Sequence, residues 1–400
     1  MKEQKGGTGR RDFFKSGALA ALPLLVPAAA FGRDAAPDDR GTDGGPAPVN
    51  FIYDGPMFSP RDYLNILHEM DRADPIEIDY YTNGGVTEAL EDEFARITGK
   101  EKAIYLPTGT MANQLAMKVL NGEDTKVIVP DNSHIFRDEA DAAQSVHRLR
   151  LVPLGKGKPY YELDELKKEI DYINRNEVFK SGLGTVVIEN PIRRADGTVI
   201  PFETIKEITS YCRQQGYRLH LDGARLHIAS AYSGIPVAEY ASLFDTVYVS
   251  LYKYLNAGSG AILCGEAELI AQMPHQIKIL GGSMLRAWSN TAMALHFLKG
   301  VDERWEQISK TGSRLISELN KLDGLRISPV ENGSNVYDMS LAKEIDPGKL
   351  ADYLHASHHI SLRPAEESGL VKFKLNETLL YRPMEDYIVA WEAGMEQARG

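Results

Sequence analysis

Four groups of residues that could do chemistry each follow an apolar, strand-like run. Asp222 ends the run RLHLD, and Lys253 comes shortly after the run TVYVS. His134 follows KVIVP, and a turn containing Gly109 and Thr110 follows KAIYL and opens a helical pattern. Because the carboxyl ends of parallel strands share one edge of a sheet, we expect these groups to meet there.

Each group by itself also has an ordinary structural explanation. Threonine is a common N-cap, a histidine after a strand can cap a helix or lie at the surface, and a lysine at a strand end can be solvated. A carboxylate at the end of a buried strand is different, because it is costly unless something specific neutralises it. The question is therefore what Asp222 faces.

Together the groups fit a site for pyridoxal phosphate. An aspartate keeps the pyridine nitrogen protonated, a lysine forms a Schiff base with the aldehyde, and an imidazole can stack on the ring. The N-terminus of a helix can hold the phosphate. Lys253 must be partly neutral to attack an aldehyde, which burial among apolar neighbours favours. The combination is far more specific than any of its parts.

The pattern around these residues predicts an α/β fold. Apolar strands alternate with amphipathic helices, for example a helix that has Leu90, Phe94 and Ile97 on one face and stops at Gly99. Such a series indicates a mostly parallel sheet with helices on both faces. The sequence predicts an N-terminal segment (49–75) that crosses to the C-terminal part, a large domain (76–300), and a smaller C-terminal α+β domain (301–400).

The first residues predict a targeting segment. Arg10 and Arg11 precede two phenylalanines and a short apolar stretch that is too rich in Pro and Ala to be a membrane span. We interpret residues 1–31 as a twin-arginine signal peptide with a small-residue cleavage region near Ala28 to Ala30. Residues 32–48 are predicted to be a disordered linker. The expected location is periplasmic or extracytoplasmic, with no stable membrane association after signal cleavage.

Composition limits the choice of partner. The chain has 400 residues, 43% of them hydrophobic and 25% charged, with a formal net charge of −11. This acidic balance, without a dense basic block, argues against nucleic acid as a partner. Cys212 and Cys264 do not have the spacing of a metal site, which argues against bound zinc, and we expect both to be core residues that could pair only if they lie close together.

Four motifs also resemble a known family. GKEKAIYLPTGTMANQLAM, SHIFRDEA, LHLDGARL and SLYKYLNAGSGAILCG are similar, in this order, to segments of the threonine aldolase and β-eliminating lyase group of fold-type I pyridoxal phosphate enzymes. The similarity runs from about Tyr80 to Leu295 and more faintly to the C-terminus. It implies the fold-type I architecture and a role for each matching residue.

The implied roles concern the cofactor first. By resemblance, Lys253 forms the Schiff base, His134 stacks on the ring and Asp222 pairs with its nitrogen. Arg225 would lie near the phenolic oxygen and the substrate carboxylate. Gly109 and Thr110 would hold the phosphate, while Lys278 and Arg286 would reach it from a neighbouring subunit. Such a shared site implies a homodimer or homotetramer.

Substrate recognition departs from the family pattern. Tyr53 stands where the family has a serine that touches the substrate carboxylate. Ile192, followed by Arg193, stands where it has a histidine that contacts the β-hydroxyl. The carboxylate-binding arginine of the C-terminal domain is replaced by Lys372, or alternatively by Lys374. Arg193 could reach an anionic group of a substrate or be a solvated surface residue. We therefore expect the cofactor chemistry to be kept and the substrate preference to differ.

These observations predict a lyase that acts on a small amino acid. Lys253, His134 and Asp222 would be catalytic, and the expected reaction is aldol-type cleavage of a β-hydroxy-α-amino acid. One alternative is β-elimination or racemisation, in which Lys253 removes the α-proton and no contact to a β-hydroxyl is needed. Another is a binding protein that keeps the cofactor pocket without turnover.

Overall fold

The structure is a computed structural model, which describes residues 46–399. The predicted twin-arginine signal (1–31) and most of the predicted linker (32–48) lie outside the described residues. Within the described part, no helix is long and apolar enough to cross a membrane.

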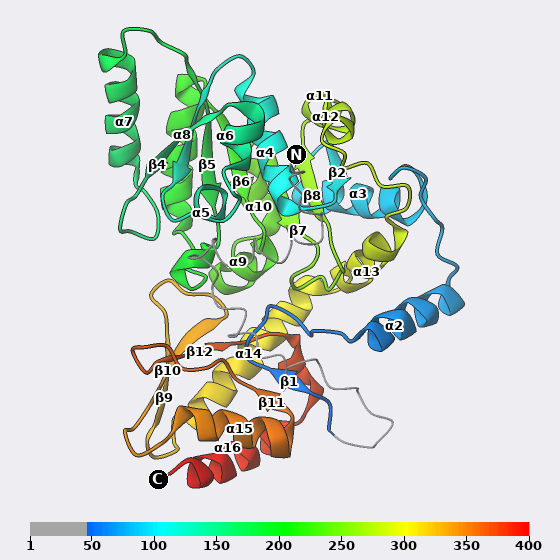
Figure 1. The fold of residues 1–400 in the computed structure, drawn as a ribbon, viewed down its shortest axis with the longest axis vertical. Helices are drawn as coiled ribbons and strands as arrows, with labels where there is room; N and C mark the ends of the chain where they lie inside the picture. Colours follow the sequence, from blue (N-terminus) through cyan, green and yellow to red (C-terminus); the bar gives the residue numbers. More distant parts are fainter. Residues whose placement is uncertain (1–45, 400) are drawn as a thin grey trace, which may run out of the picture. The chain divides into compact units, whose positions relative to one another are not determined.

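A seven-stranded sheet in the order β2-β8-β7-β6-β5-β3-β4 forms the centre of the larger part (Figure 1). The pairs from β7 through β6, β5 and β3 to β4 are parallel, whereas β8 runs antiparallel to both β2 and β7. The connection from β7 to β8 is too short for a crossover helix, which requires the antiparallel return. The strands are β2 (Lys102–Leu106), β3 (Lys126–Pro130), β4 (Arg150–Leu154), β5 (Leu183–Glu189), β6 (Arg218–Asp222), β7 (Thr246–Ser250) and β8 (Ala261–Gly265).

Helices connect these strands and cover the sheet, as the alternating pattern predicts. Strands β3, β7 and β8 are buried along their whole length, which explains their continuous apolar sequences. The helices are α3 (Gly85–Thr98), α4 (Gly109–Asn121), α5 (His134–Arg137), α6 (Ala142–His147), α7 (Leu163–Asn176), α8 (Phe202–Gln215), α9 (Leu226–Ser233), α10 (Val237–Ser242), α11 (Ala267–Ile270), α12 (Met273–Ile279) and α13 (Trp288–Leu298).

The smaller part is built on a three-stranded antiparallel sheet of order β12-β10-β9. A separate short parallel pair joins β1 to β11, so the start of the 49–75 segment adds a strand to the C-terminal part. The elements are β1 (Val49–Asn50), α2 (Pro60–Ala73), α14 (Val301–Leu319), β9 (Leu325–Pro329), β10 (Val336–Leu341), α15 (Pro347–His358), β11 (Ile360–Ser361), β12 (Val371–Lys374) and α16 (Met384–Ala398), with 3-10 turns at Arg193–Ala195 and Glu377–Tyr381.

Both cysteines are free and fully buried. Cys212 lies on α8 and Cys264 on β8, as expected for core residues. Burial raises the pKa of each thiol to about 12, so neither is a reactive thiolate at neutral pH.

Candidate active site

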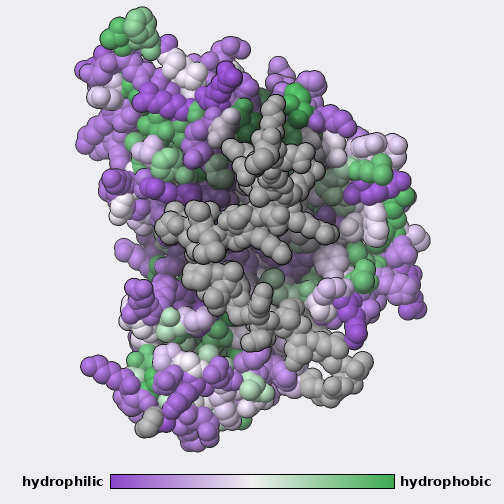
Figure 2. All heavy atoms as spheres, viewed as in Figure 1, coloured by the Kyte–Doolittle hydropathy of each residue, from purple (hydrophilic) through white to green (hydrophobic). Residues whose placement is uncertain are grey.

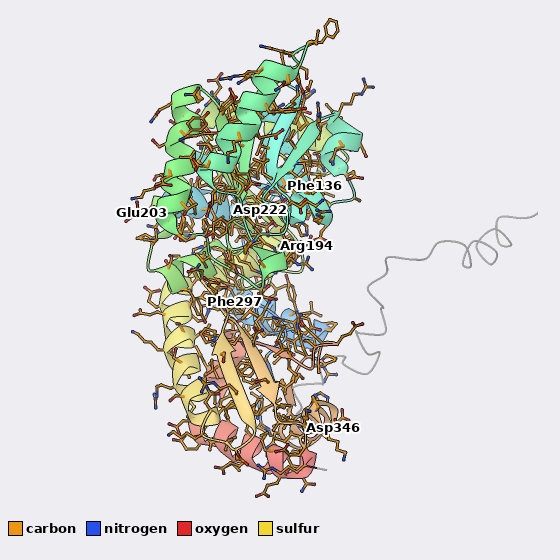
Figure 3. The ribbon with its side chains drawn as sticks, turned by 90° about the vertical axis from the view of Figure 1, so that its left-hand side faces the viewer. Phe136, Arg194, Glu203, Asp222, Phe297 and Asp346 are labelled. Carbon is orange, nitrogen blue, oxygen red and sulfur yellow. The ribbon has the colours of Figure 1, made fainter. Side chains whose placement is uncertain are left out.

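A pocket that opens to solvent lies at the carboxyl ends of the strands, and its roughly 330 Å³ of empty space includes open solvent. Six of the twelve site residues predicted from sequence line it, namely Gly109, His134, Arg193, Asp222, Arg225 and Lys253. Figure 3 shows Asp222 inside the sheet layer, with Arg194 on the side towards the antiparallel sheet. The pocket is lined by Gly109, His134, Glu189, Pro191, Arg193, Asp222, Ala224, Arg225, Tyr248, Tyr252 and Lys253.

Asp222 is held in place by donors on two sides. Its side chain, in a residue only 2% exposed, accepts a hydrogen bond from Asn113 Nδ2 (3.0 Å) and one from the Ala224 backbone N–H (3.2 Å). Each bond uses one carboxylate oxygen, so each oxygen keeps a further lone pair for a group in the pocket. Asp222 can therefore face a protonated ring nitrogen without losing its protein partners.

The orientation of Asn113 is fixed by its neighbours. Its amide nitrogen donates to Asp222 and also to Glu139 Oε1 (2.9 Å), so its oxygen must point to His220, 3.0 Å from Nε2. Burial lowers the pKa of His220 to about 4, so this imidazole is neutral at physiological pH. It donates from Nε2 and accepts from Thr246 through Nδ1 (2.8 Å). A relay of hydrogen bonds from Thr246 through the neutral His220 to Asn113 thus sets the position of Asp222.

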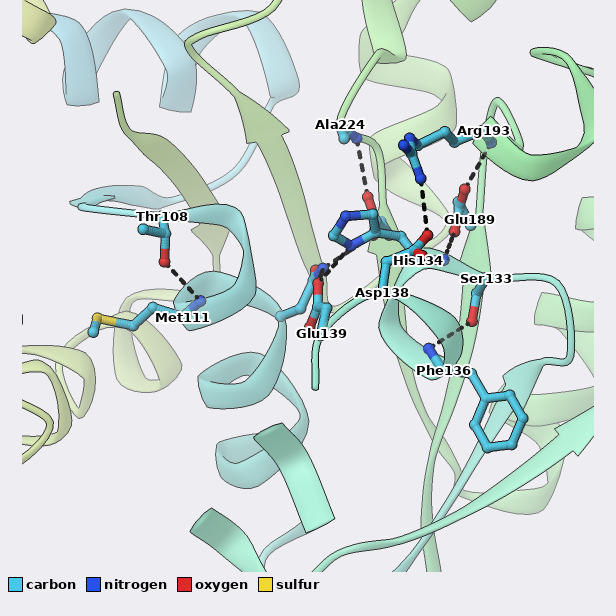
Figure 4. A network of polar contacts seen from close by, with 12 residues as sticks. Thr108, Met111, Ser133, His134, Phe136, Asp138, Glu139, Glu189, Arg193 and Ala224 are labelled. Atoms are coloured by element: carbon cyan, nitrogen blue, oxygen red, sulfur yellow. Dashed lines mark hydrogen bonds and ion pairs between the residues drawn. The ribbon is translucent and has the colours of Figure 1, made fainter. Parts of the chain in front are cut away.

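His134 is positioned by the same relay. Its Nδ1 lies 3.0 Å from Glu139 Oε1, an oxygen that also accepts from Asn113 (Figure 4). Burial opposes protonation of the imidazole, but the hydrogen bond to Glu139 and the charge of Asp222 outweigh it and raise the pKa of His134. Because Nδ1 faces Glu139, Nε2 is the ring nitrogen left to exchange a proton with a ligand.

Lys253 has the protonation behaviour that attack on an aldehyde needs. Burial, followed by the charge of Arg225, lowers its pKa to about 7 despite the opposing effects of Asp222, Asp54 and Glu189. The neutral amine is therefore accessible near neutral pH. The lysine predicted to be the nucleophile thus lies in an environment that favours its neutral form.

Arg225 and Lys374 share one buried carboxylate. Asp54 receives Arg225 Nε on one oxygen and Lys374 Nζ on the other, each at 2.9 Å. Burial would raise the pKa of Asp54, but the two cations hold it well below its usual range. Burial and the charge of Arg225 in turn lower the pKa of Lys374 despite the carboxylate. The three side chains carry one more positive than negative charge when Lys374 is protonated.

Glu189 joins two walls of the pocket. Its Oε2 accepts the backbone N–H of His134 (2.6 Å) and its Oε1 accepts that of Arg193 (2.8 Å) (Figure 4). Burial and the nearby charge of Asp222 raise the pKa of Glu189 to about 7. The carboxylate thereby fixes the backbone of two segments, the one after β3 and the one after β5, where each borders the pocket.

The N-terminus of α4 provides a seat for an anion. Thr108 is the N-cap, and its Oγ1 accepts from Met111 N (3.2 Å), so this hydroxyl is used for capping. The amides of Gly109 and Thr110 make no hydrogen bond to any described residue, which leaves them for an anion. A Cβ on Gly109 would lie 2.0 Å from the Tyr248 hydroxyl, so only glycine allows this approach. The seat fits a phosphate.

Three predicted substrate-binding residues lie elsewhere. Ile192 is fully buried in the hydrophobic core, because its backbone pairs with Thr198 and turns the side chain inward. Lys372 is held away by ion pairs to Asp196 (2.8 Å) and Asp338 (2.6 Å). Tyr53 does not line the pocket either. Lys374, the alternative to Lys372, is the lysine that approaches the site, through Asp54.

Lys278 and Arg286 also lie outside the pocket. Both are exposed, and each is placed over a tyrosine ring, Lys278 Nζ at 5.6 Å from the centroid of Tyr81 and Arg286 Cζ at 5.1 Å from that of Tyr80. Arg286 Nη1 also donates to the Asp79 carbonyl oxygen (2.6 Å). Within this chain they do not reach the seat at Gly109.

Sequence reasoning missed four residues that shape the site: Asn113, Glu139, Glu189 and Asp54. Asn113 could have been noticed as a polar residue inside the apolar pattern of α4, and Glu189 as a second carboxylate at a strand end. Asp54 carries no local signal, because its partners Arg225 and Lys374 come from distant segments. Glu139 lies five residues after His134 and could have been noticed as a partner for that imidazole.

Known proteins resemble this chain in both fold and sequence. The chain matches a Listeria monocytogenes structure provisionally described as an L-allo-threonine aldolase, with a TM-score of 0.73 and 24% identity over 88% of this chain and 96% of that one. This neighbour and others share the fold of fold-type I enzymes, which are pyridoxal phosphate-dependent.

The profile of the β-eliminating lyase family matches residues 68–342. The chain therefore belongs to the β-eliminating lyase family. It is 29% identical over 285 residues to a low-specificity L-threonine aldolase of Candida albicans, covering 70% of this chain and 75% of the relative. It is also 33% identical over 264 residues to an alanine racemase of Cochliobolus carbonum, covering 63% of this chain and 66% of the relative.

Proposed function

We propose that the protein binds pyridoxal phosphate through Lys253 and cleaves the Cα–Cβ bond of a β-hydroxy-α-amino acid. The observation that carries the proposal is the placement of Lys253 and Asp222 in one pocket. Lys253 has a pKa of about 7, and Asp222 is buried with a lone pair free on each oxygen. The relatives named as threonine aldolases support the choice of reaction.

Each side chain then has a distinct task. When bound, pyridoxal phosphate supplies a ring that takes up the electron pair released at the α-carbon. Asp222 favours the protonated ring nitrogen, and Lys253 provides the amine that holds the cofactor and moves protons at the α-carbon. His134, held by Glu139 through Nδ1, is placed to accept the proton of the β-hydroxyl at Nε2. Arg225 supplies positive charge for the substrate carboxylate.

The test is product formation by the purified protein loaded with pyridoxal phosphate. We expect threonine, allo-threonine and other β-hydroxy amino acids to give glycine and the corresponding aldehyde. The Cα–Cβ bond breaks, the β-hydroxyl loses its proton and the α-carbon gains one. Glycine and aldehyde should appear in equal amounts by mass spectrometry. A loaded protein that releases neither from any β-hydroxy amino acid would rule the proposal out.

Racemisation is a second candidate, favoured by one structural observation and one comparison. The position of the family histidine is occupied by Ile192, whose side chain lies in the core, so this position supplies no contact to a β-hydroxyl. A relative that is 33% identical over 264 residues is named an alanine racemase. Racemisation would show as solvent deuterium entering the α-position of alanine, with both enantiomers present at the end and no aldehyde.

We infer that the active form is a homodimer or homotetramer in which Lys278 and Arg286 reach the phosphate of a neighbouring subunit. Near them lies a hydrophobic patch, defined here as Ile78, Tyr80, Tyr81, Ile279 and Leu285, each of which is at least 45% exposed. In Figure 2 hydrophobic residues interrupt the polar surface on the right-hand side, where Figure 1 places α2 and the loop before α3. An exposed group of this kind is typical of a subunit interface.

Mixing two inactive variants tests this shared site. Lys253→Ala and Arg286→Ala should each be inactive alone. A hybrid dimer would contain one site with both residues intact and one site that lacks both. Random association makes about half of the dimers hybrids, so the mixture should show about a quarter of the wild-type activity. Light scattering should show that both variants remain oligomers. If co-expression restores no activity while hybrids form, Arg286 does not act across the interface.

We also infer that the protein is exported to the periplasm by the twin-arginine route after it has folded with its cofactor. The support is the sequence at Arg10 and Arg11. Replacing both by lysine should lower the periplasmic fraction at least about tenfold and leave soluble, yellow protein in the cytoplasm. Arg33→Lys, in the predicted linker, is the matched control. Unchanged export of the double variant would refute the signal assignment.

A further inference from the structure

One pocket residue, Arg193, has no task in the chemistry described above. It lies just after β5, and its backbone N–H is fixed by Glu189. The anion seat at Gly109 packs against Tyr248 of β7, which is separated from β5 by β6. Arg193 therefore lines the side of the pocket away from that seat, so it is poorly placed to hold the cofactor phosphate.

The charge of Arg193 is only partly balanced. Its Nη1 donates to Asp138 Oδ2 (2.9 Å), and this is its one side-chain hydrogen bond to a described residue. Arg194 donates to both oxygens of the same carboxylate, at 2.9 and 2.6 Å. One acid thus serves two guanidinium groups, and a net positive charge remains. Figure 4 shows the Arg193 side chain extending towards His134 and Ala224, both of which line the pocket.

The other cations of the pocket have partners or tasks already. Arg225 is bound to Asp54, and Lys253 holds the cofactor in the proposed function. The Arg193 side chain is 49% exposed and keeps guanidinium donors that make no hydrogen bond to any described residue. A guanidinium of this kind matches a carboxylate, which it can bind through two parallel hydrogen bonds.

We propose that Arg193 binds an anionic group at the end of the substrate side chain, so that the pocket selects β-hydroxy amino acids with an acidic β-substituent. This inference rests on the proposed function and names its substrate class, of which 3-hydroxyaspartate is the simplest member. A methyl group, as in threonine, would leave the guanidinium donors unused. Ile192, buried beside Arg193, offers no polar contact that would favour the neutral substrate.

Cleavage of 3-hydroxyaspartate balances without an additional reactant. The Cα–Cβ bond breaks, the β-hydroxyl loses its proton and the β-carbon becomes the aldehyde carbon of glyoxylate. The α-carbon gains a proton and yields glycine. Threonine gives glycine and acetaldehyde by the same steps, so the two substrates differ only in the group that would meet Arg193.

The first experiment compares kcat/KM for 3-hydroxyaspartate and threonine in the loaded enzyme. We expect 3-hydroxyaspartate to be preferred at least about tenfold, as one charge-assisted contact would provide. Arg193→Met should lower this ratio at least about tenfold, whereas Arg194→Met, which removes an equal charge beside the same Asp138, should change it less than about threefold. A preference for threonine, or an equal loss of the ratio in both variants, would overturn the proposal.

The second experiment measures binding without cleavage. Aspartate and asparagine, which lacks the charge, are titrated into the loaded enzyme while the absorbance of the bound cofactor is followed. Aspartate should bind at least about tenfold more tightly in the wild type, and Arg193→Met should abolish the difference. Equal binding of the two ligands to the wild type would refute the proposal. Weaker binding of both ligands to Arg193→Met would also refute it, because Arg193 would then contact the α-carboxylate that the two ligands share.

The two measurements separate this inference from the proposed function. If aspartate is preferred through Arg193 but no β-hydroxy amino acid is cleaved, the proposed function fails and the assignment of Arg193 stands. If β-hydroxy amino acids are cleaved without any preference for the acidic ligand, the proposed function stands and the assignment of Arg193 fails.

Discussion

Lys253→Ala is expected to abolish the covalent attachment of pyridoxal phosphate and to lower turnover at least about 10³-fold. The reason is the position of the amine. It lies just past the end of β7, is partly buried, has a pKa of about 7 and is the one lysine that lines the pocket among the described residues. Borohydride reduction followed by digestion and mass spectrometry should place the cofactor on Lys253 in the wild type and on no lysine in the variant.

An exposed lysine provides the control for this experiment. Lys156→Ala, in the loop before α7, should keep the label and the activity of the wild type. The assignment would be contradicted by a label on another lysine in the wild type, or by a Lys253→Ala variant that still carries the reducible bond. Circular dichroism should confirm that both variants fold.

Asp222→Asn is expected to lower turnover by at least about 10²–10³-fold, the range for losing one electrostatic contact to developing charge. An amide is neutral, so it no longer favours the protonated pyridine nitrogen. The amide also has one oxygen, whereas Asp222 accepts bonds from Asn113 and Ala224 through two. In the variant, either Asn113 Nδ2 or the Ala224 N–H therefore faces the NH₂ group of the new asparagine and loses its acceptor. We expect this loss to weaken cofactor binding as well.

Two measurements distinguish this effect from a damaged fold. The thermal unfolding of the cofactor-free variant should stay close to that of the cofactor-free wild type, because a buried charge is removed at the same time as a hydrogen bond. The cofactor should bind more weakly in a titration followed by absorbance. A loaded variant with turnover within about threefold of the wild type would show that Asp222 does not face the ring nitrogen.

The part of the site that could be predicted from sequence is the part fixed by strand ends. Asp222 is the last residue of β6, and His134 and Lys253 lie just past the ends of β3 and β7. Parallel pairing brings these strand ends to one edge of the sheet. The strand pattern also gave the parallel sheet correctly. The apolar pattern does not, however, reveal the direction of β8. This strand runs antiparallel to β7 because the connection between the two is short.

Residues whose position depends on a loop path could not be predicted in this way. The segment after β5 turns back so that Ile192 pairs with Thr198, which moves the side chain from the expected site into the core. Asp54 meets Arg225, which is 171 residues away along the chain, and Lys374, which is 320 residues away. No spacing rule connects such distant positions, because only the packing of the C-terminal sheet brings them together.

The shared carboxylate of Asp54 has a consequence for how the protein balances stability against function. An unbalanced buried charge costs folding free energy, and the protein reduces this cost in part by lowering the pKa of Lys374. An arriving carboxylate would supply the missing negative charge, so ligand binding and resistance to unfolding are linked. Replacing Lys374 with an apolar residue would then raise the free energy of unfolding and lower the catalytic activity. This is the usual direction of a stability–activity trade-off.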